Sequence, residues 1–264
     1  MNKQPHILCD SRDISPNVLL PGDPGRVRYI ADTFLAKSKL VAANREFVTA
    51  IGMYKGVRIT VTSTGIGCPS TAIATEELIN CGAKILIRVG TCGGALKQNI
   101  PVGSIIVPTA CVREEGTTKE YIPAEFPAVS DYRIVAALEK SAIKNSYRYF
   151  VGINRTHDAF YGQSKNIKAW GSPYLDPRMK SWNYPLISSE MEASALFIIA
   201  SMRGVQAGAV LAVNAPPETL SDIVRNTKKF STPQTSVSTA EAKKSVDRAI
   251  RCALDAIVDL QTSQ

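Results

Sequence analysis

Short apolar stretches typical of buried strands alternate along this chain with stretches that have the periodicity of amphipathic helices. The strand-like runs are 17–20, 47–53, 57–62, 85–89, 103–113, 150–154 and 205–213. The helical runs begin near residues 24, 68, 131, 188 and 239. Such alternation favours a largely parallel sheet covered by helices. The composition does not change as it would at a linker, so we expect residues 1–264 to form a single α/β domain, with 1–16 as an N-terminal arm.

The first strand-like run ends in a segment suited to binding an anion. Pro21-Gly22-Asp23-Pro24-Gly25-Arg26 follows it directly. Asp23 can cap a helix and Pro24 suits its first position, so a helix N-terminus would face Gly22, with Arg26 on the first turn. The Gly-Lys-Ser/Thr ending of a Walker A loop is missing. The alternative is an ordinary capped turn with a surface arginine.

An arginine interrupts the apolar strand at 85–89, which reads Ile-Leu-Ile-Arg-Val and continues as Gly90-Thr91. A buried charge without a partner is costly, so Arg88 requires an anion. Glycines after the strand would let backbone N–H groups approach that anion, and Thr91 adds a hydroxyl. The anion is either a ligand or a structural carboxylate, and the strand alone does not distinguish the two.

The overall composition limits the classes of partner. The formal charge is +8, but Lys and Arg are scattered and not interleaved with aromatic residues, which disfavours nucleic acid. Two histidines exclude a multi-histidine metal site, and the six cysteines lack metal-ligand spacing. Neither a signal peptide nor a membrane-spanning apolar run is recognisable. We therefore expect a cytoplasmic protein with unpaired cysteines and no membrane partner.

The second half of the chain carries further candidate groups. The run 157–165 offers Phe160, Tyr161 and Gln163, which suit a planar heterocycle, although the aromatic rings could equally belong to a core. Residues 168–187 have no clear period and indicate a long loop or lid. Glu190 and Glu192 open an apolar helix, where acidic residues are also good capping groups.

Taken together, the motifs resemble those of the hexameric nucleoside phosphorylase family, and most closely uridine phosphorylases. The matching segments are Pro-Gly-Asp-Pro at 21–24, Asn-Arg-Glu-Phe at 44–47, Ser-Thr-Gly-Ile-Gly at 63–67, Arg-Val-Gly-Thr at 88–91, Glu-Phe-Pro-Ala-Val at 125–129 and Glu-Met-Glu at 190–192. The resemblance implies a single-domain α/β fold with a central mixed twisted sheet flanked by helices. It also implies a glycosyltransferase of nucleotide salvage that assembles as a homo-oligomer, as a trimer of dimers with shared active sites.

The resemblance assigns roles to individual residues. Arg88 and Glu192 would be catalytic. The expected phosphate ligands are Gly22, Arg26, Arg88, Thr91 and, from a neighbouring subunit, Arg45. The expected ribose ligands are Met191, Glu192 and, across the interface, His6 at the 5′-hydroxyl. The expected base ligands are Phe160, Gln163 and Lys165. A monovalent cation such as K⁺ is expected near Glu46, Ile66 and Ser70, with phosphate as co-substrate and no organic cofactor.

The implied reaction is phosphorolysis of a pyrimidine nucleoside to free base and ribose 1-phosphate. Fixed phosphate would serve as nucleophile and as counter-charge for the developing positive sugar. The chain departs from the uridine phosphorylase pattern at Lys165 and Ala215, where arginines are usual, and lysine lacks the planar fork. Purine nucleosides are the second hypothesis, although Asn214 cannot donate the proton that an aspartate supplies there. A non-catalytic nucleoside-binding protein is the third.

Overall fold

The computed structural model describes residues 3–94, 100–160, 186–215 and 240–262. The strands are β1 (Asn17–Leu20), β2 (Ala36–Asn44), β3 (Phe47–Tyr54), β4 (Val57–Thr62), β5 (Ile85–Gly94), β6 (Ile105–Glu114), β7 (Ala128–Val129), β8 (Tyr149–His157), β9 (Leu186–Glu190) and β10 (Gln206–Ala215). The helices are α1 (Pro24–Phe34), α2 (Cys68–Asn80), α3 (Thr117–Tyr121), α4 (Tyr132–Lys144), α6 (Ala193–Arg203) and α8 (Ala240–Thr262).

All the described strands belong to one mixed sheet. Its order is β10-β6-β8-β9-β5-β1-β4-β3-β2, and β10 also pairs with β5, so that β10, β6, β8, β9 and β5 form a closed ring. Strands β1, β4, β5 and β10 run parallel to one another. Strands β2, β3 and β4 form an antiparallel meander. The mixed α/β fold is the one that the family resemblance implies, whereas a largely parallel sheet is only partly correct.

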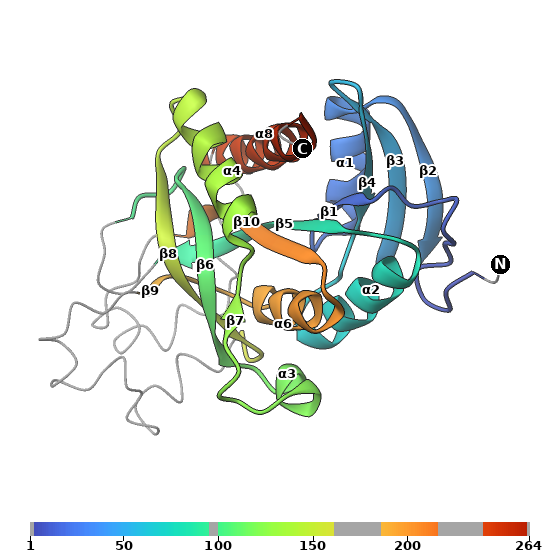
Figure 1. Cartoon of the computed structure of the whole chain (residues 1–264). Helices are drawn as coiled ribbons and strands as arrows, with labels where there is room; N and C mark the ends of the chain where they lie inside the picture. The colour runs from blue at the N-terminus through green and yellow to red at the C-terminus, as the bar shows by residue number, and fades with distance from the viewer. Residues whose placement is uncertain (1–2, 95–99, 161–185, 216–239, 263–264) are drawn as a thin grey trace, which may run out of the picture.

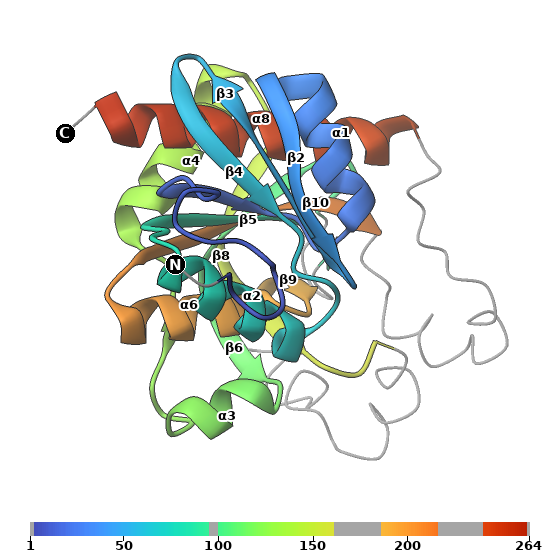
Figure 2. The same cartoon turned by 90° about the vertical axis from the view of Figure 1, so that its right-hand side faces the viewer.

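Helices cover both faces of the sheet. In Figures 1 and 2, α1, α4 and α8 lie on one side of the strands, and α2 and α6 lie on the other. The alternation along β1 separates the two cores: Leu19 packs with α1 and α8, whereas Val18 and Leu20 pack with α2 and α6. Along β5, Leu86 faces the α2–α6 side. Arg88, two residues later, therefore points to the same side as Leu86.

Local capping explains where α1 and α4 begin. The Asp23 carboxylate accepts a hydrogen bond from the backbone N–H of Gly25 at 2.8 Å, and Pro24 opens α1 as predicted. Asp131 caps α4 in the same way through the N–H of Arg133. The predicted hairpin between β3 and β4 turns at Lys55 and Gly56, which both have positive φ.

Two segments differ from the sequence pattern. Residues 186–190 form β9, and α6 starts only at Ala193, so the acidic segment is a strand that leads into a helix. The expected arm, 1–16, is not separate from the core, because the Ile7 and Cys9 side chains are completely buried. None of the helices in the described part of the chain combines the length and apolar character needed to cross a bilayer.

Candidate functional site

The carboxyl ends of parallel strands meet at one edge of the sheet, and the glycine-rich turns predicted from the sequence lie there. The turn after β1 is joined to the turn after β4 by two backbone hydrogen bonds, from Thr64 to Pro21 at 2.9 Å and from Gly65 to Gly22 at 3.0 Å. One turn leads into α1 and the other into α2. A helix N-terminus thus follows each of the two joined turns, which favours an anion.

Arg88 lies beneath these turns and is almost completely buried, with 4% of its surface exposed. Its Nε donates to Glu190 Oε2 at 3.0 Å, and its Nη2 donates to Glu192. Its Nη1 has no hydrogen-bond partner among the described residues. A methyl group on Gly22 would lie 3.9 Å from Nη1, so this nitrogen faces the turn after β1. The carboxylate partners of Arg88 are thus Glu190 and Glu192, and one of its donors is left without a partner among the described residues.

The Glu190 carboxylate is held in place by hydrogen-bond donors at both of its oxygens. Its Oε1 accepts from Asn154 Nδ2 at 2.8 Å and from Thr156 Oγ1 at 2.6 Å. Its Oε2 accepts from Arg88 Nε and from the backbone N–H groups of Glu192 and Ala193 at 2.8 and 2.9 Å. A carboxylate offers about four lone-pair sites. Glu190 therefore has no capacity left for a ligand and acts by fixing its neighbours.

Glu192 is bound differently, because it connects Arg88 to α2. Its Oε1 accepts from the backbone N–H of Gly67 at 2.6 Å, at the N-terminus of that helix. Burial raises the pKa of this carboxyl, the nearby Glu190 charge adds to the rise, and Arg88 opposes it. Glu192 thus keeps lone pairs that a hydroxyl donor can use.

Arg26 brings a second guanidinium to the same place. Its Nη1 contacts the carbonyl of Val89 at 3.4 Å. Burial lowers the pKa of Arg26, and the positive charge of Arg88 lowers it further, while Asp23 raises it. The two guanidinium groups thus lie close enough for each charge to affect the other, and an anion bound between them would be attracted to both. Thr91, three residues after Arg88 on β5, lies at the partly buried end of the strand.

Gly90 makes room for the Arg88 guanidinium. A methyl group at this position would lie 2.8 Å from Nη2, 2.9 Å from Cζ and 2.9 Å from a methyl group of Leu211 on β10. Those distances are too short for a carbon atom, and the neighbour on β10 is part of the core. Position 90 is therefore restricted to glycine by the Arg88 side chain.

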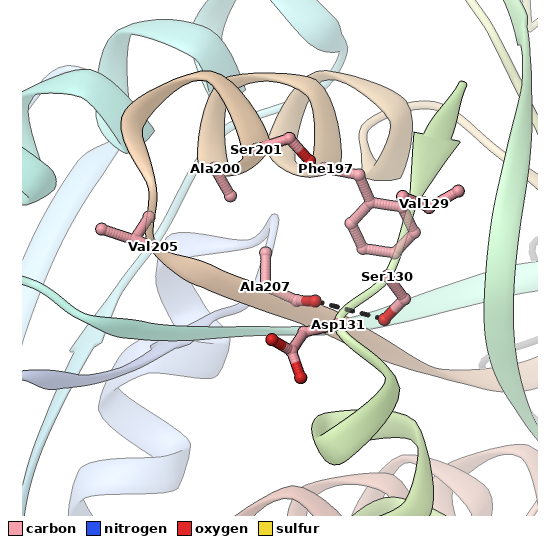
Figure 3. A pocket seen from close by; sticks show the side chains of 8 residues that line it. All are labelled: Val129, Ser130, Asp131, Phe197, Ala200, Ser201, Val205 and Ala207. Carbon is pink, nitrogen blue, oxygen red and sulfur yellow. Dashed lines mark hydrogen bonds between the residues drawn. The ribbon is translucent and has the colours of Figure 1, made fainter. Parts of the chain in front are cut away.

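A cavity of the described structure lies elsewhere. It has a volume of about 110 Å³ and is bordered by residues from β7, the start of α4, the second half of α6 and β10. Figure 3 shows its walls and the hydrogen bond from Ser130 to the carbonyl of Ala207. A groove of about 290 Å³ runs between α4 and α8. Neither contains Arg26, Arg88 or Glu192, so the candidate site is the cluster at the sheet edge.

Residues 16–258 match the model of a family described as the Phosphorylase superfamily. The chain belongs to the phosphorylase superfamily. A uridine phosphorylase from Treponema pallidum is 44% identical over 209 residues, which cover 79% of this chain and 80% of the relative. A guanosine phosphorylase from Halorubrum lacusprofundi is 40% identical over 261 residues, which cover 98% of this chain and 100% of the relative.

Solved structures agree with this membership. The crystal structure of uridine phosphorylase from Vibrio fischeri ES114, complexed with 6-hydroxy-1-naphthoic acid, superimposes with a TM-score of 0.81. The two chains are 33% identical and cover 98% of each other. The resemblance to nucleoside phosphorylases, closest to uridine phosphorylases, is thus confirmed, and with it the enzyme class, a pentosyltransferase. Membership implies small-molecule substrates, phosphate as co-substrate and a homo-oligomer.

Two residues that a nucleoside phosphorylase is expected to offer to a neighbouring subunit lie on one surface of this chain. Arg45 is exposed at the turn between β2 and β3, with a φ of 52°. The preceding Asn44 donates from its side chain to the carbonyl of His6 at 2.8 Å. The His6 ring meets the ring of Phe47 edge-on, with centroids 6.3 Å apart. The arm and this turn therefore form one unit.

The residues expected around a cation also lie together. Ser70 Oγ donates to the carbonyl of Ile66 at 3.2 Å. A methyl group on Gly65 would lie 2.7 Å from Glu46 Cγ and 3.0 Å from Ser70 Oγ, and Gly65 has a φ of 73°. Hydroxyl, carbonyl and carboxylate oxygens suit a hard cation, and the Ile66 side chain is 80% exposed.

The base side is described only in part. Phe160 is 53% exposed just beyond the end of β8, which leaves its ring accessible. Gln163, Lys165 and nearly all of the expected lid at 168–187 lie outside the described residues. Met191 is partly buried between β9 and α6, and its carbonyl accepts from the Cys68 thiol at 3.2 Å.

Sequence reasoning missed three residues that position the site, namely Asn154, Thr156 and Glu77. The first two lie on β8 and donate to Glu190. The third lies inside α2 and binds the arm. In the sequence, these residues could be recognised as polar residues on the buried side of a strand or helix, because a polar side chain there requires a partner.

Proposed function

We propose that this enzyme catalyses the phosphorolysis of a uridine-like pyrimidine nucleoside to free base and ribose 1-phosphate. The observation that carries the proposal is the buried Arg88 guanidinium, whose Nη1 is left without a partner beneath the two glycine turns. A buried donor without an acceptor costs free energy unless a ligand satisfies it. A phosphate oxygen is the acceptor that best suits a guanidinium fork at a helix N-terminus.

The charges explain why a neighbouring subunit is needed. Within the chain, Glu190 and Glu192 both pair with Arg88, and Asp23 lies near Arg26. A phosphate dianion would add negative charge where carboxylates already oppose both guanidinium groups, so a further cation would help to hold it. Arg45, exposed on the unit that also carries His6, would supply it from the adjacent protomer. This agrees with the proposed trimer of dimers, in which each active site is shared.

Each group then has a role in the reaction. The guanidinium groups of Arg26 and Arg88, with Gly22 and Thr91, would hold phosphate below the sugar. Glu192 would accept hydrogen bonds from the ribose hydroxyls, and Met191 would contact the ring. As the glycosidic bond lengthens, the sugar becomes positive and the fixed phosphate stabilises it before bonding to it. No covalent intermediate with the protein is required.

The identity of the base rests on Asn214 and on the relatives. An amide at the end of β10 can donate to or accept from a pyrimidine but cannot protonate a purine nitrogen. Phe160 would stack on the base, and Gln163 and Lys165 would contact its edge. A purine nucleoside is the second candidate, because a guanosine phosphorylase is 40% identical over 98% of this chain and the usual base arginines are replaced by Lys165 and Ala215.

Two accompanying proposals concern the environment of the enzyme. A monovalent cation such as K⁺ would bind the oxygens of Glu46, Ile66 and Ser70, where it would stabilise the interface between subunits. A cytoplasmic location is supported by the six buried cysteines, none of which is paired in the described chain.

The decisive experiment is absorbance-monitored cleavage of uridine, thymidine, inosine, guanosine and adenosine, each with and without phosphate. The proposal predicts phosphate-dependent cleavage with a preference for uridine or thymidine. Preference for a purine nucleoside would replace the first candidate with the second. Cleavage at the same rate without phosphate, or binding without any turnover, would refute phosphorolysis.

A further inference from the structure

Glu77 is a buried carboxylate of α2 that the reaction does not use directly. It is 6% exposed and its neighbours on the helix are apolar core residues such as Leu78. A buried carboxylate is stable only when donors satisfy it. Among the described residues, the donors to this carboxylate come from the arm, 70 residues earlier in the chain.

The arm supplies three N–H groups to this one side chain. The backbone N–H of Ile7 donates to Glu77 Oε2 at 2.8 Å, and the backbone N–H of His6 lies 3.1 Å from the same oxygen. The imidazole Nδ1 of His6 lies 2.6 Å from Oε1. Figure 2 shows the N-terminal segment beside α2. The carboxylate thus fixes both the backbone and the ring of His6.

The hydrogen bond to Nδ1 selects the state of the ring. An acceptor-only carboxylate requires a proton on Nδ1, so the neutral ring carries its proton there and leaves a lone pair on Nε2. The side chain of His6 is 40% exposed, and its edge contact with Phe47 limits ring rotation. The contacts with Glu77 and Phe47 therefore hold the ring in one orientation, in which Nδ1, not Nε2, faces Glu77.

We propose that Glu77 is a positioning residue that orients His6 toward the 5′-hydroxyl of a nucleoside bound in the adjacent subunit. This inference rests on the proposed function, because His6 is its only link to the substrate. Glu77 fixes the Nδ1–H tautomer, so that Nε2 accepts from the hydroxyl. The preference for a nucleoside with a 5′-hydroxyl over its 5′-deoxy analogue depends on both residues acting together.

The test is a double-mutant cycle read out as a ratio. The kcat/KM for uridine is divided by that for 5′-deoxyuridine, or the matching pair is used for whichever nucleoside the enzyme cleaves. His6→Ala should reduce this ratio about tenfold, the size of one hydrogen bond. Glu77→Gln should reduce it by a similar factor. In the His6→Ala background Glu77→Gln should not reduce it further.

The neighbouring residue provides a matched control. Glu76 lies on the same helix and forms a bidentate pair with Arg203 at 2.9 Å for both contacts, away from the arm. Glu76→Gln removes a carboxylate from the same turn of α2 and should leave the ratio unchanged. An equal loss of the ratio in this control would mean that α2 as a whole, not Glu77, sets the preference.

A spectroscopic measurement keeps the inference testable if Glu77→Gln folds poorly. The chain has two histidines, so a ¹⁵N-histidine NMR spectrum of the wild-type protein contains the signals of two imidazole rings. At a pH where its ring is neutral, His6 should show the Nδ1–H tautomer, and Glu77→Asp should shift the population toward Nε2–H. An Nε2–H ring in the wild type would overturn the positioning role.

The outcomes separate this inference from the proposed function. Absence of phosphorolysis would refute the proposed function, while the tautomer would still report on the Glu77–His6 contact. Phosphorolysis with no effect of His6→Ala would refute the role of His6 at the hydroxyl. An effect of His6→Ala that Glu77→Gln does not reproduce would refute the positioning by Glu77.

Discussion

The Arg88→Lys substitution keeps the positive charge and removes the guanidinium geometry, so it tests the two separately. The arginine satisfies two carboxylates with two different nitrogens, and its third nitrogen, the proposed phosphate donor, has no partner among the described residues. Lysine retains the positive charge between Glu190 and Glu192, but one ammonium group cannot reach all three positions. Arg88→Lys should therefore fold and lose most phosphate use, whereas Arg88→Ala leaves two buried carboxylates without a partner.

The magnitudes follow from these contacts. Arg88→Lys loses about one hydrogen bond to a charged group, so its free energy of unfolding should fall by ~1.5–3 kcal/mol. Arg88→Ala should lose ~3–5 kcal/mol, as when a buried ion pair is broken. The kcat/KM for phosphate should fall about 10²–10³-fold in Arg88→Lys, the usual effect of removing one donor to transition-state charge.

Two assays measure these effects. Urea unfolding at a fixed protein concentration gives the free energies, because assembly makes stability depend on concentration. Initial rates at saturating nucleoside and varied phosphate give the kinetic loss. Arg203→Lys is the control, since its pair with Glu76 is exposed and should contribute under ~1 kcal/mol. Arg88→Lys with wild-type phosphate kinetics would refute the assignment of Arg88 to the phosphate site.

Three further predictions concern neighbouring groups. Glu192→Gln should lower kcat/KM by roughly 10²–10³-fold without loss of phosphate binding, and near-wild-type kinetics would exclude its role at ribose. Gly90→Ala should raise the KM for phosphate because a methyl group would displace the Arg88 guanidinium, and unchanged phosphate kinetics would show that the strand adapts. Burial lowers the pKa of His157 to about 4. Since the unfolded chain takes up this proton first, stability should fall as the pH decreases from about 6.5 to about 4, and His157→Gln should flatten that part of the urea-unfolding profile.

The parts of the fold that the sequence predicts correctly depend on neighbouring residues. Asp23 followed by Pro24 specifies the start of α1 through a contact two residues away. The Lys55-Gly56 turn specifies the hairpin between β3 and β4 in the same local way. Gly22 and Arg88 could be recognised as candidate ligands because each follows or interrupts an apolar strand.

The remainder depends on contacts between distant parts of the chain. Glu190 is fixed by Arg88, 102 residues earlier, and by two residues of β8. The local pattern of a single sequence does not reveal which strand lies beside which, so neither β9 nor its antiparallel pairing with β5 could be predicted. The same holds for Glu77, which reads as an ordinary helical residue until the arm is placed against it.

The hydrogen-bond sites of the Glu190 carboxylate are all occupied, and this affects how such enzymes can diverge. Arg88, Glu190 and Glu192 are each buried and each a partner of another, so a change in one disturbs the core as well as the reaction. Phe160, in contrast, is half exposed beyond the end of β8, so its replacement should cost less stability than the loss of a buried ion-pair partner. The buried ion-pair cluster is thus under a constraint that does not apply to the position proposed to stack on the base. We expect a change of base preference to disturb the scaffold less than a change at the proposed phosphate and sugar ligands, and the relatives include both a uridine and a guanosine phosphorylase.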